Sequence, residues 1–283
     1  MLSKNVEVFM GCDWEPEEAD TILFGAPFDS TTSYRPGTRF GSSAIRHEAY
    51  GLEDYSPYQD KDLSQVKTAD IGDLELCIGD TKTVLDQIET CAGEILAAGK
   101  RPFMLGGEHL VTLGAFRAAV KKYPDIHIIH FDAHADLRED YLGMPLSHAC
   151  VLRRCWELAG DGKIFQFGIR SGDRKEFEWG KDHVTTQKFS FDGLEETLEL
   201  LRGKPVYFTV DLDVMDPSVF PGTGTPEPGG VSFDELRKAV TLVCSRAEVM
   251  ACDVNELSPH YDQSGVSTMA AGKIVREMLL ALG

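Results

Sequence analysis

The segment His127-Ile128-Ile129-His130-Phe131-Asp132-Ala133-His134-Ala135-Asp136 contains the pattern on which the fold prediction rests. A short, mostly apolar run, 127–131, is followed at once by a polar segment, 132–136. Short continuous apolar runs are typical of strands that are buried on both faces of a parallel sheet. In such sheets the loops after the carboxyl ends of the strands form the binding crevice. The segment therefore predicts an interior strand with a polar site at its end.

The same alternation of apolar runs and polar segments extends along the whole chain. Strands are expected at Thr21–Ala26, Lys67–Ile71, Pro102–Leu105, His127–Phe131, Ile164–Phe167, Val184–Lys188, Val206–Val210 and Glu248–Cys252. Amphipathic helices are expected between them, for example over 81–99, over about 266–282, and after Gly230, where Ser232-Phe233-Asp234-Glu235 has the form of a capping box. This order predicts an α/β fold, a three-layer α/β/α sandwich around a mostly parallel eight-stranded sheet. Because no repeat or linker interrupts it, residues 1–283 are expected to form a single domain.

Composition excludes several classes of protein. The chain has 283 residues, of which 42% are hydrophobic, enough for a large core and too many for a disordered protein. Its apolar runs are shorter than the roughly 20 residues of a membrane helix. The formal net charge of −18 disfavours nucleic acid and favours cationic partners. The seven cysteines are an odd number without a C-x-x-C pair, which argues against a disulfide framework and a thiolate zinc site. We therefore expect a cytoplasmic protein that binds neither nucleic acid nor membrane.

Four of the expected strands end in residues of the metal-ligand type. The segments are Gly106-Gly107-Glu108-His109, Asp132-Ala133-His134-Ala135-Asp136, Asp211-Leu212-Asp213 and Asp253-Val254-Asn255-Glu256. Alternate residues of an extended chain share a face, so Asp132, His134 and Asp136 point to one side, as do Asp211 and Asp213. Carboxylates crowded in this way repel one another unless cations neutralise them. Two divalent ions with bridging carboxylates would do so, and a set of four carboxylates and two imidazoles favours Mn²⁺.

Two other histidines need separate interpretation. His130 lies two residues before Asp132 and so shares its face in an extended chain. It lies inside the expected strand, however, so we interpret it as a packing residue or as a support behind the ligands. His148, in Leu146-Ser147-His148-Ala149, follows the loop after Asp136. The residues alone leave two roles open for His148, the start of a helix or a catalytic acid/base at the metals.

Together these motifs resemble those of the ureohydrolases, the family of arginase, agmatinase and their relatives. The resemblance extends to Arg35–Gly41 and to Pro259–Asp262, so it covers nearly the whole chain, and it is strongest to the bacterial agmatinases. It implies the same three-layer sandwich, assembled as a homo-oligomer, a trimer or a hexamer. One position departs from the family pattern: Leu110 follows His109 where many members have Ser, and we expect only a change in packing.

The resemblance also implies roles for individual residues. His109, Asp132, Asp136 and Asp211 would hold one Mn²⁺, and Asp132, His134, Asp211 and Asp213 would hold the second. A water between the two ions would become the hydroxide nucleophile. Glu256 would pair with the substrate guanidinium, Asp136 or His148 would pass a proton to the departing amine, and Asp253 would lie behind the ligands.

The expected substrate is agmatine, cleaved to putrescine and urea. In the arginases that this chain resembles, an Asn in the corresponding segment helps to hold the α-carboxylate of the substrate. Segment 137–146 contains no Asn, and Glu139 and Asp140 would repel a carboxylate, although Arg138 is an opposing charge. Alternatively, Glu139 and Asp140 are merely solvated loop charges. Other substrates within the same chemistry are guanidinobutyrate, arginine and formiminoglutamate. A non-enzymatic alternative is an inactive metal-binding paralogue with a regulatory role, but no ligand, nor His148 or Glu256, is missing.

Overall fold

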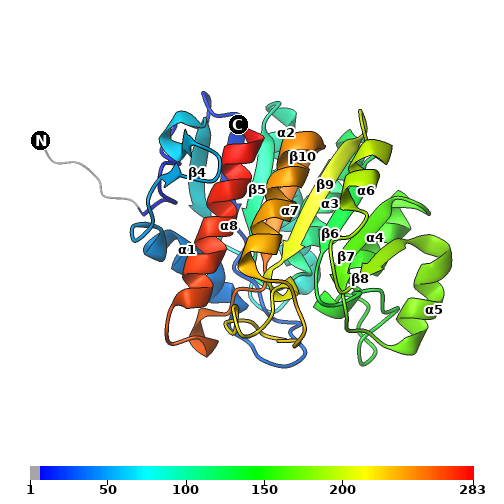
Figure 1. Ribbon diagram of the computed structural model, residues 1–283. Helices are drawn as coiled ribbons and strands as arrows, with labels where there is room; N and C mark the ends of the chain where they lie inside the picture. The colour runs from blue at the N-terminus through cyan, green and yellow to red at the C-terminus, as the bar shows by residue number, and fades with distance from the viewer. Residues whose placement is uncertain (1–6) are drawn as a thin grey trace, which may run out of the picture.

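A sheet of eight parallel strands forms the middle layer of the computed structural model, which describes residues 7–283 (Figure 1). Its strands are β1 (Thr21–Gly25), β4 (Thr68–Asp73), β5 (Arg101–Leu105), β6 (His127–Phe131), β7 (Ile164–Ile169), β8 (Thr185–Lys188), β9 (Pro205–Asp211) and β10 (Glu248–Asn255). They lie in the order β4-β1-β5-β10-β9-β6-β7-β8, and every neighbouring pair is parallel. All eight predicted strands are confirmed, with ends that differ by a few residues.

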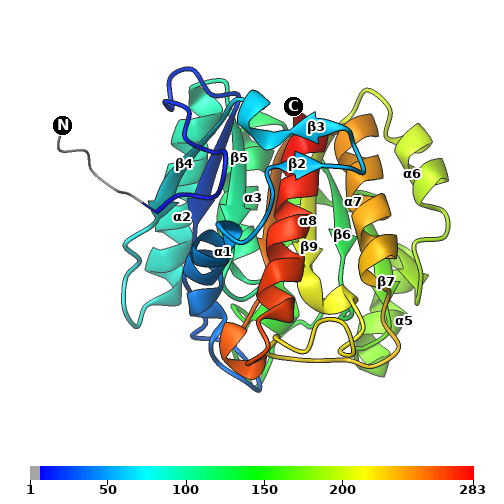
Figure 2. The same ribbon diagram turned by 60° about the vertical axis from the view of Figure 1, so that its left-hand side comes forward.

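Helices cover both faces of the sheet (Figures 1 and 2). One layer contains α1 (Gly41–Ala49), α6 (Leu194–Leu200), α7 (Phe233–Arg246) and α8 (Val266–Leu282), and the other contains α2 (Thr81–Ala97), α3 (Val111–Lys122), α4 (Val151–Ala159) and α5 (Arg174–His183). Adjacent strand residues face opposite layers, so Phe103 belongs to the first hydrophobic core and Met104 to the second. The predicted three-layer sandwich is therefore confirmed.

The helix signals in the sequence correspond to real helix ends. Ser232 caps α7, because the Ser232 Oγ accepts a hydrogen bond from the Glu235 N–H and the Glu235 carboxylate accepts one from the Ser232 N–H. The helices expected over 81–99 and about 266–282 are α2, which ends two residues earlier at Ala97, and α8. Within residues 7–283, no helix combines the length and the apolar character that a membrane crossing needs.

Some elements were not predicted. A small antiparallel hairpin pairs β2 (Tyr55–Ser56) with β3 (Lys61–Asp62), and strands of two residues are too short to leave a pattern in the sequence. There are also five 3₁₀ turns among the described residues, η1 (Thr38–Phe40), η2 (Leu63–Gln65), η3 (His148–Cys150), η4 (Leu212–Val214) and η5 (Pro259–Tyr261). The expected end of β10 at Cys252 is wrong, because pairing with β9 continues until Asn255 meets Asp211.

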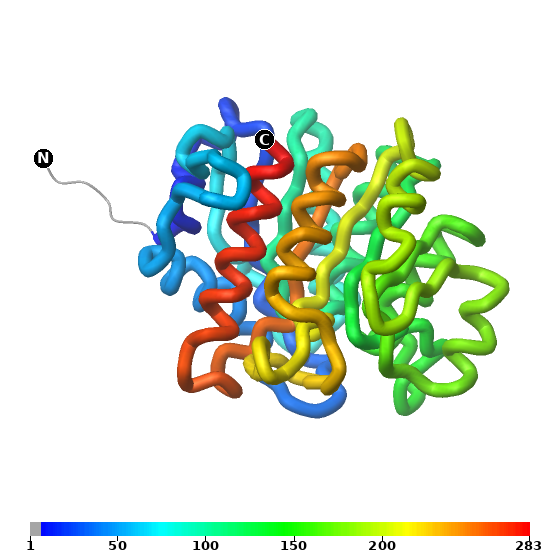
Figure 3. The backbone as a smooth tube through the Cα atoms, in the orientation of Figure 1, coloured from blue at the N-terminus to red at the C-terminus, as the bar shows by residue number. Residues whose placement is uncertain are grey.

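The carboxyl ends of β5, β10, β9 and β6 lie side by side in the middle of the sheet and face the lower side of the molecule in the view of Figure 3. Two glycines allow the chains to approach closely there. A Cβ on Gly106 would lie 1.8 Å from Asn255 Oδ1, and one on Gly107 would lie 1.9 Å from the carbonyl oxygen of Phe28. Because neither glycine has a side chain, the ends of β1, β5 and β10 can converge here. The segment that follows, which carries His109, is thereby directed toward β6 and β9.

Candidate metal centre

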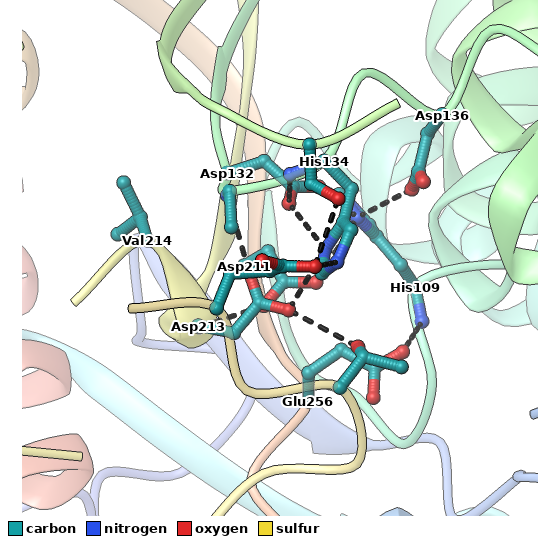
Figure 4. A network of polar contacts seen from close by, with 12 residues as sticks. His109, Asp132, His134, Asp136, Asp211, Asp213, Val214 and Glu256 are labelled. Carbon is teal, nitrogen blue, oxygen red and sulfur yellow. Dashed lines mark hydrogen bonds and ion pairs between the residues drawn. The ribbon is translucent and has the colours of Figure 1, made fainter. Parts of the chain in front are cut away.

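His109 lies at the centre of one group of carboxylates (Figure 4). It follows β5, and its Nδ1 is 3.0 Å from Asp132 Oδ2, 3.3 Å from Asp136 Oδ2 and 3.4 Å from Asp211 Oδ2. His109 itself is fully buried. The structure thus brings together the four side chains that the family resemblance assigns to one ion.

His134 occupies the equivalent place in a second group. Its Nδ1 is 3.4 Å from Asp132 Oδ1 and 3.0 Å from Asp213 Oδ2. Asp132 therefore presents one oxygen to each histidine. Asp211 directs its Oδ2 toward His109, while its Oδ1 accepts a hydrogen bond from the Asp213 N–H at 2.8 Å. The two groups share Asp132 in this arrangement and lie next to each other at Asp211 and Asp213.

Local backbone conformation places these side chains. Parallel pairing of Phe131 with Val210 aligns the ends of β6 and β9, so that Asp132 and Asp211 follow at the same level. The Ala133 N–H then donates to Asp213 Oδ1 at 3.2 Å, which joins the two segments. Asp136 has a φ of 53°, a left-handed conformation that is uncommon for a residue with a side chain. Residues in such conformations concentrate at functional sites, where neighbouring structure holds them.

The pKa shifts of these buried side chains indicate a site at which additional positive charge would be favourable. Burial, followed by the charges of Asp213 and Asp132, raises the pKa of Asp211 well above its ordinary value, and burial likewise raises the pKa of Asp213. Burial opposes a low pKa for Asp132, but hydrogen bonds from His109 and then His130 hold it well below the usual range. Against the effect of burial, neighbouring carboxylates raise the pKa of His109 and of His134. The carboxylates thus favour positive charge at both histidines, and a bound metal ion would supply that charge instead.

The residues present fit divalent metal ions. Separations of 3.0–3.4 Å between donor atoms match those of ligands about 2.1 Å from a common ion. Two groups of side chains are compact enough to hold an ion, His109 with His130 and Asp132, and Asp132 with His134 and Asp213. Carboxylate oxygens and imidazole nitrogens, without thiolates, are ligands that suit Mn²⁺.

His130 has a hydrogen-bonding pattern that disfavours it as a ligand. The Gln166 side-chain amide lies 3.0 Å from His130 Nδ1 and also donates to the Ala135 carbonyl, while its own oxygen accepts from Thr186. An amide N–H donates to Nδ1 only if that nitrogen is unprotonated, so the ring proton lies on Nε2. Nε2 then donates to Asp132 Oδ2 at 2.8 Å. His130 is thus placed to orient Asp132, a role typical of residues that support metal ligands.

Glu256 closes the far side of the group. It has a φ of 66°, and its Oε1 accepts a hydrogen bond from the His109 N–H at 2.9 Å and lies 3.4 Å from His148 Nδ1. Its Oε2 is buried and has no hydrogen-bond partner among residues 7–283. A buried carboxylate oxygen without a donor is costly, so this atom marks a place for a cationic ligand.

Asp253 lies behind the group, fully buried inside β10. Its carboxylate accepts hydrogen bonds from the side chains of Thr112, Tyr207, Thr209 and Asn255. The Thr209 hydroxyl also lies 2.8 Å from His109 Nε2 and so connects Asp253 to the second nitrogen of that ring. We did not predict a role for Thr209. It lies two residues before Asp211 in β9 and so on the same face of the strand, which could have identified it.

A cleft of about 260 Å³ leads to the candidate metal ligands. Its lining, besides candidate ligands, includes Ser33, Arg138, Tyr141, His148, Asp173, Glu176 and Thr225. Arg138 lies 3.0 Å from Asp173 and 3.4 Å from Glu176, so two carboxylates offset its charge. Glu139 and Asp140 instead line an adjoining cavity of about 330 Å³. Asp173 and Glu176, which were not predicted, therefore provide the acidic character expected of Glu139 and Asp140 at the cleft.

Comparison with known proteins gives consistent matches over nearly the whole chain. The model of the Arginase family matches residues 19–281. The agmatinase of Bacillus subtilis (strain 168) is 48% identical over 277 residues, covering 97% of this chain and 96% of the relative. The N(1)-aminopropylagmatine ureohydrolase of Thermococcus kodakarensis is 40% identical over 250 residues, or 86% and 84% of the two chains. The crystal structure of the agmatine ureohydrolase of Thermoplasma volcanium has a TM-score of 0.89 and 35% identity, and covers 99% of this chain and 95% of that one.

Proposed function

The chain belongs to the arginase family, and from this premise we propose that it is an agmatinase, an enzyme that hydrolyses agmatine to putrescine and urea. Family membership and the agmatinases at 48% identity establish the broader class, a ureohydrolase. The substrate, the metal ions and the roles of individual residues are the proposal. The observation that carries it is the buried, unpaired Glu256 Oε2 beside two groups of His and Asp side chains.

We propose that two Mn²⁺ ions bind per chain. His109, Asp132, Asp136 and Asp211 would hold one, and Asp132, His134, Asp211 and Asp213 would hold the other. When bound, the ions would supply a nucleophile, because a divalent cation lowers the pKa of water bound to it. The chain's own contribution is to hold the ligands in place before the metal arrives, through Thr209 on His109 and His130 on Asp132.

Glu256 would bind the guanidinium group. A guanidinium stays cationic at neutral pH and presents N–H donors in a plane. The free Oε2 can accept one of these donors, while Oε1 remains fixed by the His109 N–H. Because this carboxylate is shielded from water, its hydrogen bond to a cation contributes more than a surface ion pair does.

His148 would provide the proton that the departing amine needs. Burial lowers its affinity for a proton, but the adjacent Glu256, followed by Glu108 and Asp136, raises the pKa of His148 to about 9. The ring is then protonated at neutral pH and can act as a general acid. This supports an acid/base role for His148 over the alternative that it only starts a helix, although His148 does begin η3. Asp136, in the same cleft, is the alternative route for the proton.

The outer part of the cleft favours a cationic tail. Asp173 and Glu176 together carry two negative charges against the single positive charge of Arg138, which leaves this wall with a net negative charge. Agmatine ends in an ammonium group, whereas guanidinobutyrate, arginine and formiminoglutamate carry carboxylates. Electrostatic complementarity therefore supports agmatine over these alternatives.

A panel of substrates tests the proposal. With added Mn²⁺, urea release from agmatine should exceed that from arginine and guanidinobutyrate, and formiminoglutamate should not be hydrolysed. In Asp173→Asn, kcat/KM for agmatine should fall while that for guanidinobutyrate stays level or rises. Preference for a carboxylate-bearing substrate would overturn the choice of agmatine, and failure to hydrolyse any of the compounds would favour the inactive paralogue. The homo-oligomeric state and the cytoplasmic location stay predictions.

A further inference from the structure

The loop between β1 and η1 lines the cleft at the candidate metal centre and contacts His148 twice at Ser33. The Ser33 N–H lies 3.1 Å from His148 Nε2, and the Ser33 hydroxyl lies 2.9 Å from the same nitrogen. The opposite ring nitrogen, Nδ1, faces Glu256. Ser33 is 115 residues away from His148 in sequence, and nothing in the motifs pointed to it.

These two contacts serve different protonation states of the ring. A backbone N–H can donate only to an Nε2 that carries a lone pair, so it fits the neutral ring with its proton on Nδ1. When the ring is protonated, Nε2 becomes a donor, and the Ser33 hydroxyl oxygen is then the available acceptor. In both states Nε2 keeps a partner in Ser33, and Nδ1 remains directed at Glu256.

A buried carboxylate anchors the segment that carries Ser33. Glu108 is fully buried, and it accepts hydrogen bonds from the Thr31 N–H at 3.0 Å and the Thr32 hydroxyl at 2.8 Å. The Thr31 hydroxyl also donates to Glu108 and lies 3.1 Å from the His148 N–H. The same short segment thus holds both the backbone and the ring of His148, so Ser33 meets Nε2 without rearrangement of the loop.

We propose that Ser33 is a positioning residue for His148, which keeps Nδ1 directed at Glu256 and stabilises the protonated ring through its hydroxyl. The charged groups that face this ring from neighbouring segments are Glu256, Glu108 and Asp136, and none of them contacts Nε2. The Ser33 hydroxyl is therefore the contact at Nε2 that distinguishes the two protonation states. The inference rests on the proposed function in one respect, the role of protonated His148 as the acid.

Ser33→Ala tests the hydroxyl alone, because it leaves the backbone N–H in place. Loss of an acceptor from the cationic ring should lower the pKa of His148 by about one unit. If protonated His148 is the acid, activity is lost as the pH rises through this pKa, so the alkaline limb of kcat should move to lower pH by about the same amount. Ser33→Thr keeps a hydroxyl and should return the limb toward its wild-type position. Ser30→Ala, at an exposed serine in the same loop, is the matched control and should leave the profile unchanged.

A second measurement is independent of the substrate. Diethyl pyrocarbonate reacts with neutral imidazole, so the pH dependence of its reaction with His148 reports the pKa of the ring in the Mn²⁺-loaded protein. Trypsin should release residues 139–153 as a peptide in which His148 is the single histidine, and mass spectrometry can follow it.

The combined outcomes separate the two ideas. A reaction profile that shifts in Ser33→Ala but not in Ser30→Ala supports the inference, even if agmatine is not hydrolysed and the proposed function fails. If the protein hydrolyses agmatine but neither profile moves in Ser33→Ala, Ser33 does not position His148. Equal shifts in Ser33→Ala and Ser33→Thr would also refute the inference, since they would reflect a general disturbance of the loop.

Discussion

Glu256→Gln separates substrate binding from metal binding. The substitution preserves the shape of the side chain, and the glutamine oxygen can still accept the hydrogen bond that Glu256 Oε1 receives from the His109 N–H. At the position of the unpaired Oε2, however, the amide would present an NH₂ group. A guanidinium also presents donors only, so the two groups would face each other without an acceptor.

The expected loss follows from the type of interaction. A hydrogen bond between charged groups contributes about 1.5–3 kcal/mol net, more than a neutral one. At about 1.4 kcal/mol per tenfold, kcat/KM for agmatine should fall by roughly ten- to a hundredfold. The substitution also removes the carboxylate that raises the pKa of His148, so the alkaline limb of activity should move to lower pH. Metal content should not change, because no donor atom of Glu256 is assigned to an ion.

The assay combines steady-state kinetics on agmatine with elemental analysis of the same preparation. Glu178→Gln, which neutralises an exposed carboxylate on α5 outside the cleft lining, is the matched control and should retain wild-type kinetics. Loss of metal in Glu256→Gln would make this residue a ligand. Wild-type kcat/KM together with full metal content would mean that Glu256 does not contact the guanidinium.

Three further predictions concern the metal ions. Exhaustive chelation should abolish urea release and Mn²⁺ should restore it, whereas activity in protein shown to be metal-free would contradict the proposed chemistry. Asp211→Asn should lower the occupancy of both ions, because Asp211 Oδ2 faces His109 and Asp213 lies beside Asp211, while Asp213→Asn should mainly weaken binding of the ion at His134. Titration of metal into the apoprotein would show both effects. Two-ion binding in Asp211→Asn as tight as in wild type would refute the prediction. Gln166→Leu removes the donor that keeps the His130 proton on Nε2, so metal affinity should fall by about ten- to a hundredfold. Unchanged affinity in the same titration would mean that other contacts set the orientation of His130.

The strands could be predicted from sequence because both faces of this sheet are covered. Phe131 and Met104 are buried on opposite faces, so the runs to which they belong are mostly apolar instead of alternating with polar residues. The end of β10 could not be predicted in the same way, since Asp253 and Asn255 look like residues beyond a strand. They remain inside it because Asp253 is surrounded by hydroxyl and amide donors, which side-chain polarity alone does not reveal.

The candidate ligands could be predicted for a related reason. Asp132, His134 and Asp136 are close in sequence just after one strand, which placed them at one site, although the extended geometry assumed for them does not reach Asp136, whose φ is 53°. Ser33 and Asp173 reach the cleft on separate loops, and no periodicity connects either residue to the ligands. Sequence reasoning also placed the acidic charges of the cleft at Glu139 and Asp140, because position along the loop does not show which cavity a carboxylate lines.

The place of β10 in the sheet has a consequence for the newly synthesised protein. This strand comes late in the chain, yet it lies between β5 and β9 in the middle of the sheet. Until it inserts, no strand of the sheet joins β5 to β9, and Glu256, which follows β10, is not yet in place. Contacts of such long sequence separation form slowly. Binding of the metal ions should therefore coincide with completion of the sheet. The rate of metal binding during refolding would then report the rate at which β10 inserts.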